Sequence, residues 1–246
     1  MSPAALSERL LGRARVYPVG AVIRWDWLAE AIAPCLEGRE VRVLDAGCGD
    51  GAYLFRLARR YPGATFAGVD MSEEPIRCAQ ARLAAHPQPN LTFALADLTH
   101  DQGDRLYDLI YSIDVFEHIP DDRAALAALA RALQPGGRTL LHTPLSPQRH
   151  WLRRFDLDRC QDEDHVRAGY SVAELEAKAR AAGLAPSGVH YTHGRWGTLA
   201  WELWMLAKDA GWSRAAAWPA IRLLVSLEFA GEHEWGNCLL FEATKP

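Results

Sequence analysis

Short aliphatic segments alternate with helix-like segments along most of the chain from residue 41 onward. Five of the aliphatic segments are apolar at nearly every position, which is typical of strands in a sheet that helices cover on both faces. They span residues 41–45, 65–70, 91–95, 107–112 and 138–142. Because strands and helices alternate, the pattern predicts an α/β fold built on a parallel sheet.

Two of the helices between and after these strands have readable starts. Asp121 is placed to cap a helix over residues 122–133, in which the leucines share one face. Ser171 and Glu174 form a capping-box pattern ahead of a helix over residues 172–182. These two helices are therefore predicted from their caps as well as from their apolar faces.

The composition narrows the class of protein. With 246 residues, of which 49% are hydrophobic, the chain can bury one substantial core, and we expect a single domain. Its net charge of −4 provides no basic field for a phosphate backbone, which argues against nucleic acid as a partner. The five cysteines are scattered without a C-x-x-C pair, and the first 20 residues lack the apolar run of a signal peptide. We therefore expect a cytoplasmic protein whose residues 1–20 belong to the mature chain.

A glycine-rich turn, residues 45–51, joins the first expected strand to a helix pattern over residues 52–61. Gly47 and Gly49 have no Cβ atom, so they can adopt positive φ and let a ligand approach the backbone. Open α/β sheets bind ligands at this carboxyl end of their strands. Asp45 is placed there to accept hydrogen bonds, directly or through water, from the ammonium group of an amino-acid moiety. The turn is thus the strongest candidate binding site in the sequence.

Carboxylates follow the next two strands as well. Asp70 comes 25 residues after Asp45, where a carboxylate can bind ribose hydroxyls, and Asp97 lies where an adenine amino group needs an acceptor. A glycine turn and a ribose carboxylate also serve dinucleotide enzymes. However, the turn here has the spacing D-x-G-x-G rather than G-x-G-x-x-G, which favours a different adenosine-containing cofactor.

In this order and at these spacings, the motifs resemble those of the class I S-adenosylmethionine-dependent methyltransferases, especially the small-molecule group that includes enzymes of the ubiquinone-biosynthesis type. The resemblance covers residues 41–144 and includes the segment 107–119, with its Asp-x-x-Glu-His ending, and the turn 133–137. It implies a Rossmann-like sheet of seven mostly parallel strands with helices on both faces. It also implies N-terminal helices and a tryptophan-rich helical insertion before the last strand.

The resemblance also assigns the cofactor, S-adenosyl-L-methionine, with S-adenosyl-L-homocysteine as the product. The positions that it implies for cofactor binding are Asp45, Gly47, Cys48, Gly49, Asp70, Met71, Asp97, Leu98 and Ser112. Within a single methyltransferase domain, residues 1–40 would form a helical cap, residues 41–145 the cofactor-binding core, and residues 146–246 the substrate-side elements and final strands.

Transfer of a sulfonium methyl group proceeds by in-line displacement, so the protein has to align the acceptor, exclude water and, where needed, remove a proton. Asp114, Glu117 and His118 follow the fourth strand and are expected to face the methyl end of the cofactor. His118 is the favoured base, because an imidazole changes its charge near neutral pH. His165 is a second candidate base or substrate contact, and Tyr170 a candidate pocket wall. The alternative is that these residues only stabilise their loops.

No metal is predicted. Some relatives with a Glu-x-x-Glu-His segment bind a divalent cation, and an alternative interpretation lets Asp114, Glu117, His118 and His142 hold Mg²⁺, Mn²⁺ or Zn²⁺. The first position of this chain departs from that pattern, because an aspartate stands where those relatives have a glutamate.

From Trp196 onward the chain contains six of its nine tryptophans, with a helix expected over residues 199–208 and the last strand over residues 237–243. In the family that the chain resembles, residues 17–35 and 194–233 recognise the acceptor. Their aromatic side chains favour a small, lipophilic or aromatic metabolite, and also a weak peripheral contact with a membrane. Alternatively, the tryptophans are helix core facing the sheet.

The leading expectation is therefore an enzyme that methylates such a metabolite, at oxygen rather than at nitrogen or carbon. Two other functions stay open at this stage. A non-catalytic regulatory protein would carry the same cofactor residues, and a nucleotide-dependent oxidoreductase would share the Rossmann sheet.

Overall fold

The computed structural model describes residues 19–37, 40–100, 106–152, 165–209, 214–231 and 233–246. The expectation for the first 18 residues lies outside the described residues, as do Cys160, one of the five cysteines, and Trp212, one of the six tryptophans from Trp196 onward.

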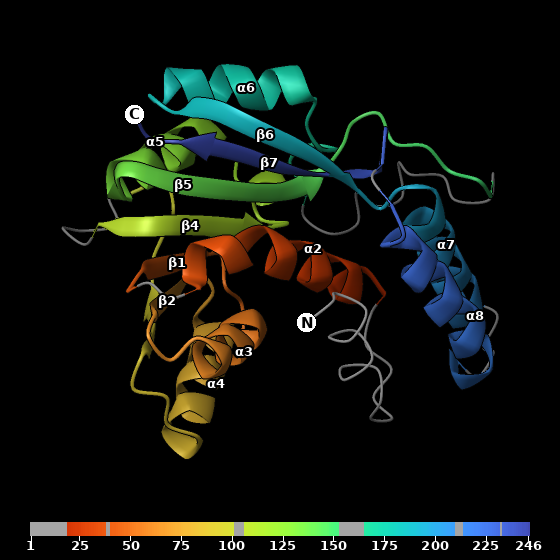
Figure 1. Ribbon diagram of the computed structural model, residues 1–246, viewed down its shortest axis with the longest axis horizontal. Helices are drawn as coiled ribbons and strands as arrows, with labels where there is room; N and C mark the ends of the chain where they lie inside the picture. Colours follow the sequence, from red (N-terminus) through yellow and green to blue (C-terminus); the bar gives the residue numbers. More distant parts are fainter. Residues whose placement is uncertain (1–18, 38–39, 101–105, 153–164, 210–213, 232) are drawn as a thin grey trace.

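One seven-stranded sheet forms the centre of the protein, with the strand order β3-β2-β1-β4-β5-β7-β6 (Figure 1). The strands are β1 Arg42–Ala46, β2 Thr65–Asp70, β3 Leu91–Leu95, β4 Tyr107–Ile113, β5 Leu133–Pro144, β6 Ala185–Thr192 and β7 Cys238–Thr244. Strands β1 to β5 pair in parallel, whereas β7 is antiparallel to both β5 and β6. The predicted α/β fold with a mostly parallel Rossmann-like sheet is confirmed.

Helices cover both faces of this sheet. The helices of the described residues are α2 Val19–Leu36, α3 Ala52–Arg60, α4 Glu73–Ala85, α5 Asp122–Ala132, α6 Val172–Ala181, α7 Arg195–Asp209 and α8 Arg214–Glu228, with a short 3-10 helix η1 over Phe116–His118. Alternate residues of a strand point to opposite faces. Accordingly, Val43 and Leu109 pack against α2, α3 and α4, whereas Leu44 and Ile110 pack against α5 and α6.

The two predicted helix starts are confirmed. The Asp121 side chain accepts a hydrogen bond from the Ala124 backbone N–H at 3.0 Å, and Ser171 and Glu174 form a complete capping box. The turn predicted over residues 133–137 is wrong in part. Strand β5 already begins at Leu133, because Leu133 pairs with Tyr107 across an irregularity in the register with β4.

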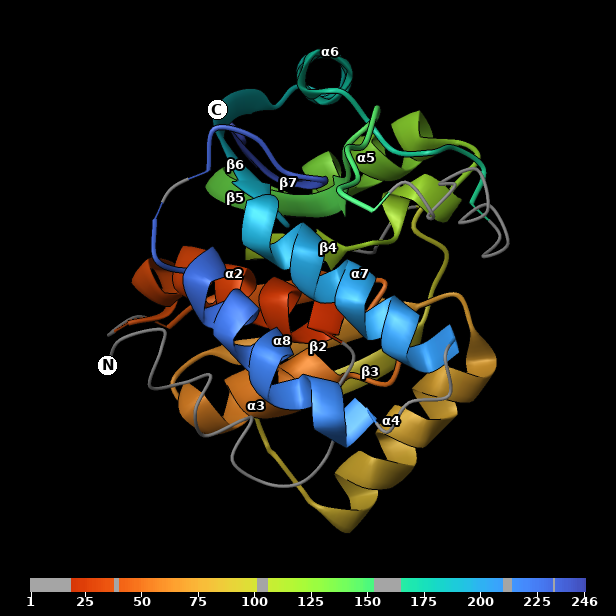
Figure 2. The ribbon, with the colours of Figure 1, turned by 90° about the vertical axis from the view of Figure 1, so that its right-hand side faces the viewer.

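Helices α7 and α8 lie side by side and pack on α2 in front of the strand ends (Figure 2). Their shared core contains Val22 and Ile23 of α2, Trp204 of α7, and Ile221 and Val225 of α8. They place a helical layer beside the carboxyl ends of the parallel strands. Within the described residues, no helix is both long and apolar enough to cross a membrane.

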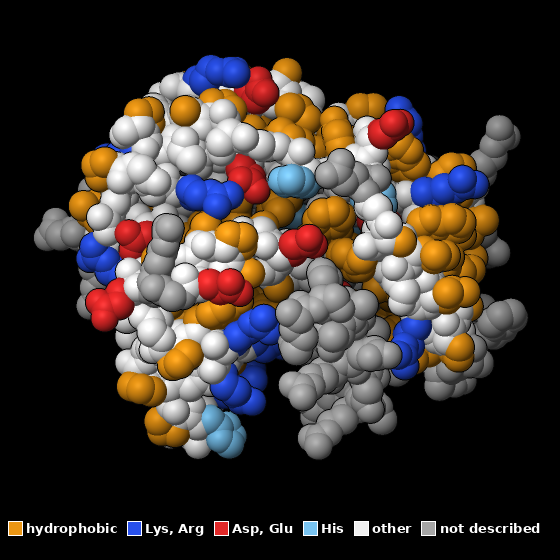
Figure 3. Space-filling view, viewed as in Figure 1, with side chains coloured by type: hydrophobic (Ala, Val, Ile, Leu, Met, Phe, Trp, Pro, Cys, Tyr) orange, Lys and Arg blue, Asp and Glu red, His pale blue; other side chains and the backbone are white. Residues whose placement is uncertain are grey.

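Charged side chains of both signs are interspersed on the face seen in Figure 3, and hydrophobic side chains gather on its α7–α8 side. Among the described side chains, this face shows no large basic patch of the kind that binding to a phosphate backbone uses.

Candidate functional site

The glycine turn after β1 is built from left-handed backbone. Gly47 has φ 87°, and a Cβ atom added there would lie 2.3 Å from Cγ2 of Val115, so only glycine fits. The N–H groups of Gly47 and Cys48 both donate to the Val69 carbonyl, at 2.8 and 2.9 Å. Gly49 has φ 52°, and no atom lies within 4 Å of its added Cβ. The hydrogen bonds to Val69 therefore fix the turn on β2, whereas the space beside Gly49 is open to a ligand.

Asp70 ties this turn to the end of β2. One carboxylate oxygen accepts the Gly49 N–H and the other accepts the Ser72 N–H, each at 2.9 Å. Each oxygen retains a further lone pair. Asp70 can thus hold the turn and still accept hydrogen bonds from a ligand's hydroxyl groups.

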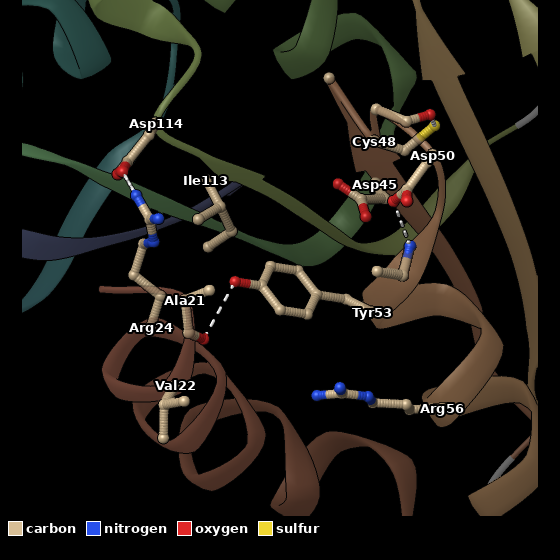
Figure 4. A pocket seen from close by; sticks show the side chains of 13 residues that line it. Ala21, Val22, Arg24, Asp45, Cys48, Asp50, Tyr53, Arg56, Ile113 and Asp114 are labelled. Atoms are coloured by element: carbon tan, nitrogen blue, oxygen red, sulfur yellow. Dashed lines mark hydrogen bonds and ion pairs between the residues drawn. The ribbon is translucent and has the colours of Figure 1, made fainter. Parts of the chain in front are cut away.

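Above the turn lies a cavity of about 420 Å³, enclosed by the turn, α3, the first turns of α2 and the end of β4 (Figure 4). It is lined by Ala21, Val22, Arg24, Asp45, Gly47, Cys48, Gly49, Asp50, Ala52, Tyr53, Arg56, Ile113 and Asp114. The Asp45 carboxyl is only 3% exposed, and burial raises its pKa from 3.8 to about 8. A cationic group that enters the cavity would relieve this cost by pairing with the carboxylate.

The remaining predicted cofactor residues lie along the same edge of the sheet but outside this cavity. Ser112 donates its hydroxyl to the Ala46 carbonyl at 2.7 Å, which links β4 to β1 beneath the turn. Met71 is 72% exposed, and Leu98 is buried in the core. Asp97 is exposed, and two hydrogen bonds from Thr99 to its carboxylate lower its pKa.

These residues fit S-adenosylmethionine on observations of this chain alone. Asp45 offers a buried carboxylate to an ammonium group, the space over Gly49 admits a ligand against the backbone, and Asp70 retains free lone pairs for hydroxyl groups. The adenine end would reach the exposed edge at Asp97. Arg24, Tyr53 and Arg56 supply the opposite wall of the cavity, and the sequence singled out none of the three, although Arg24 lies in the segment 17–35 that was expected to contact the acceptor. The charged Arg24 within an apolar stretch of α2 is the only sequence signal for this wall.

Asp114 stands at the end of β4 in left-handed backbone, with φ 51°. One of its oxygens pairs with Arg24, and the other lies 2.6 Å from Nδ1 of His142. On its other side, Nε2 of His142 lies 2.9 Å from the Thr192 hydroxyl. Burial lowers the pKa of His142 to about 3, so this imidazole is neutral. Asp114 faces the cavity and is oriented by a cation and a neutral histidine (Figure 4).

A second cluster follows directly in η1. Atoms of Glu117, His118 and His165 that could bind a metal all lie within 4.8 Å of one another. The rings of His118 and His165 meet edge to face with centroids 4.4 Å apart. Glu117 is 1% exposed, its pKa is raised by burial, and it accepts a 3.4 Å hydrogen bond from Thr143. The structure thus brings the two predicted bases, His118 and His165, together.

The segment that carries His165 is anchored to η1 by Arg167 and Tyr170. The Arg167 guanidinium donates to the backbone carbonyls of Phe116 and Ile119 at 2.7 and 2.8 Å. Tyr170 donates to Asp122 at 2.6 Å, and it is 1% exposed within the core. The expectation that Tyr170 is a pocket wall is therefore wrong, because its ring is buried against the helices behind the site.

The four residues of the alternative metal site, Asp114, Glu117, His118 and His142, lie in two different clusters. Asp114 pairs with His142, whereas Glu117 and His118 group with His165. Carboxylate and imidazole donors such as those of the second cluster can bind a divalent cation as well as move a proton.

The described tryptophans do not line the cavity above the glycine turn. Trp204 and Trp218 meet edge to face within the α2–α7–α8 core, and Trp25 stacks on Tyr53 behind the cavity wall. Trp27 instead lines a separate cavity of about 690 Å³ between α2, β6 and the end of α8. Trp204 and Trp218 thus belong to a helix core, but that core faces α2, whereas the alternative interpretation had expected it to face the sheet.

Comparisons with known proteins agree on one family. The family model that matches is described as a methyltransferase domain and covers residues 22–187. A ubiquinone biosynthesis O-methyltransferase of Aeromonas salmonicida is 31% identical over 184 residues, which make up 69% of this chain and 73% of the relative. Against most of the other similar O-methyltransferases, the match spans about half the length of the relative.

Two solved structures share the fold. A phosphoethanolamine N-methyltransferase of Haemonchus contortus, in complex with S-adenosylmethionine, has a TM-score of 0.64 and 19% identity, over 98% of this chain and 60% of that one. A TehB-like S-adenosylmethionine-dependent methyltransferase of Corynebacterium glutamicum has a TM-score of 0.54 and 18% identity, over 99% and 100% of the two chains.

Proposed function

Because this chain belongs to the S-adenosylmethionine-dependent methyltransferases, we propose that it methylates a hydroxyl oxygen of a small, lipophilic or aromatic metabolite. The names of the similar O-methyltransferases support oxygen as the acceptor atom. The observation that carries the proposal is the pair of imidazoles, His118 and His165, beside the buried Glu117 at the carboxyl edge of the sheet.

In this proposal the carboxyl ends of β1 and β2 would hold the cofactor. Asp45 would bind its ammonium group, the Gly47–Gly49 turn would contact its amino-acid portion, and Asp70 would accept hydrogen bonds from its ribose hydroxyls. Both carboxylates are already aimed by the backbone, Asp45 through burial at the strand end and Asp70 through the Gly49 and Ser72 amides. The cofactor supplies an electrophilic methyl group on a sulfonium sulfur.

His118 then accepts the acceptor's hydroxyl proton on an unprotonated ring nitrogen. Loss of this proton would make the oxygen nucleophilic enough to take the methyl group of a bound cofactor, with the neutral thioether as the leaving group. His165 fixes the ring of His118 by its edge-to-face contact. Arg167, which binds the η1 carbonyls, keeps both in place. A proton removed in this way increases the nucleophilicity of a phenolic oxygen, whereas an amine needs no such base before attack.

The apolar character of the acceptor is supported by the cavity wall. Ala21, Val22 and Ile113 present aliphatic surface, and the Tyr53 ring closes the side next to α3. The Tyr53 hydroxyl donates to the Ala21 carbonyl at 3.3 Å, so α2 is held over the site. Such a wall binds hydrocarbon or an aromatic ring and leaves Asp114 and Arg24 as its polar end.

We also propose a weak peripheral contact with a membrane, because a membrane would hold a lipophilic acceptor. Leu223 and Leu227 on α8 are 61% and 36% exposed. Co-sedimentation with anionic liposomes tests the contact. We expect partial recovery in the pellet, reduced by Leu223→Glu, and equal recovery in the supernatant with and without lipid would contradict it.

The acceptor atom is tested with labelled cofactor and two matched acceptors, an alkyl-substituted catechol and the corresponding alkyl-substituted aniline. We expect label on the catechol oxygen and little on the aniline. His118→Ala should lower kcat by on the order of 100-fold or more and leave the affinity for S-adenosylhomocysteine unchanged. His86→Ala, which removes an exposed imidazole at the end of α4, is the control and should retain full activity. Preferred labelling of the aniline, or full activity of His118→Ala, would contradict the proposal.

A further inference from the structure

Three side chains with metal-binding atoms meet behind Asp114, where β5 and β6 end and β7 begins. His142 lies near the end of β5, His193 directly follows β6, and Cys238 is the first residue of β7. The sheet register brings them together, because Cys238 pairs with Thr192 on one side and with Pro144 on the other. One potential ligand atom of each lies within 4.8 Å of the other two. We infer that His142, His193 and Cys238 form a binding site for Zn²⁺ or a similar borderline transition-metal ion.

The choice of metal follows from the donor atoms. Two imidazole nitrogens and one thiolate suit zinc, whereas Mg²⁺ and Ca²⁺ prefer oxygen ligands. In a tetrahedral zinc site the donor atoms stand roughly 3.5 Å apart. The three side chains therefore need to close by only about 1 Å around the ion. The fourth position is open to the Thr192 hydroxyl or to water.

The hydrogen bonds around His142 leave one of its ring nitrogens unprotonated on the side of Thr192. Its Nδ1 lies 2.6 Å from the Asp114 carboxylate, which favours the proton on Nδ1 and leaves Nε2 unprotonated. A histidine that donates one N–H to a carboxylate and binds a metal through its other nitrogen is a common arrangement in zinc proteins. The Thr192 hydroxyl lies 2.9 Å from Nε2 of His142 and 3.5 Å from Nδ1 of His193, so it links the two imidazoles of the site.

The protonation states suit a metal site. His142 and His193 are 2% and 7% exposed, and burial lowers the pKa of both to about 3, so both are neutral and can act as ligands. Burial raises the pKa of the Cys238 thiol to about 12. Metal binding would therefore displace the thiol proton to solvent as the metal–sulfur bond forms. The carboxylates of Asp114, Glu117 and Glu228 lie near this site and would favour a bound metal ion, whereas the guanidinium of Arg24 would oppose it.

The backbone delivers His193 to this place in an unfavourable conformation. Its φ is 52°, in the left-handed region that non-glycine residues rarely adopt. Its carbonyl accepts the Thr198 hydroxyl at 2.8 Å and the Asn237 N–H at 3.0 Å, which hold the turn. Strained residues of this kind gather at functional sites. The three donors are a different set from the cluster of Glu117, His118 and His165, which has no sulfur donor.

The test uses Co²⁺ as a spectroscopic substitute for zinc in full-length protein stripped with a chelator. We expect one equivalent of Co²⁺ to produce the visible bands of a tetrahedral ion and a thiolate-to-cobalt charge-transfer band. Zn²⁺ should abolish both, and excess Mg²⁺ should not. Each bound metal should release about one proton from Cys238 into weakly buffered solution. Because the readout is a spectrum and not turnover, it does not depend on the proposed acceptor.

Cys238→Ser should remove the charge-transfer band, whereas Cys78→Ser, which changes an exposed thiol on α4, should retain it. His193→Asn removes a ligand but keeps a residue that tolerates left-handed backbone, and it should weaken Co²⁺ binding at least 10-fold. Persistence of the band in Cys238→Ser would overturn the inference. If the serine variant does not fold, the wild-type titration decides, since the absence of a charge-transfer band there overturns the inference as well.

Discussion

Replacing Asp70 with asparagine separates the two tasks of this carboxylate. In the wild type, its two oxygens each accept one backbone N–H at 2.9 Å, from Gly49 and from Ser72. Asparagine keeps one acceptor oxygen, so one N–H loses its partner. Because the site is half-buried and water can replace the lost bond, we expect a loss of about 1 kcal/mol in the free energy of unfolding. As a separate effect, the loss of a charged acceptor for the ribose hydroxyls should weaken cofactor binding by about 2 kcal/mol, which is roughly 30-fold in Kd.

Calorimetric titration with S-adenosylhomocysteine and urea unfolding measure these two effects on the same protein. Asp108→Asn is the matched control, because Asp108 also accepts a backbone N–H, from Arg42 at 2.7 Å, but at the opposite end of the sheet. It should leave the Kd within twofold. An unchanged Kd in Asp70→Asn would refute the placement of the ribose, whereas equal losses of affinity in both variants would show that stability alone governs binding.

Gly47→Ala should lower the free energy of unfolding, measured by urea denaturation, by on the order of 3 kcal/mol, because the new Cβ atom would lie 2.3 Å from Val115. Gly49→Ala should lower it by only about 1 kcal/mol, because the space beside Gly49 is open. Equal losses in the two variants would contradict the steric argument. Buried Asp45 has a pKa of about 8, so its carboxylate forms only as the pH approaches 8, and cofactor affinity should rise with pH up to that value. The free energy of unfolding of the cofactor-free protein should fall as the pH rises from 4 to 8, because the folded state keeps the Asp45 proton that the unfolded chain loses. Calorimetry at pH 6.5 and 8.5 measures the first effect, and Asp45→Asn should abolish it. Arg167→Lys should reduce kcat about 10-fold, with unchanged cofactor affinity, because it loses the planar donors that bind the η1 carbonyls; full activity would show that the anchor is dispensable.

The parallel half of the sheet was predictable because its signals are local. Each inner strand is a nearly continuous apolar run, and the caps at Asp121 and Ser171 use hydrogen bonds that span only three residues. Strand β6 carries no such signal. It lies at the edge of the sheet, alternates between half-buried and exposed residues, and contains Pro186 and Gly188, which disfavour strand structure in a sequence pattern. An edge strand of this kind is recognised only from its partner β7.

The candidate site shows the same division. Asp45, Gly47 and Asp70 could be found from the sequence because a strand end and a turn determine their roles. The pairing of Asp114 with Arg24 and His142, and of His118 with His165, joins residues far apart in the chain. The hydrophobic pattern of the sequence does not predict such contacts, because they depend on how β5 and α2 pack beside β4. For this reason the sequence grouped Asp114, Glu117, His118 and His142, whereas the fold separates them into two clusters.

A crystal structure with S-adenosylhomocysteine bound tests the account most directly. We predict the ligand's amino group at Asp45, its ribose hydroxyls at Asp70, and its sulfur directed toward the side of the site formed by Asp114 and His118. Binding of the ligand in the cavity between α2, β6 and α8, or in the reverse direction along the sheet edge, would contradict the account.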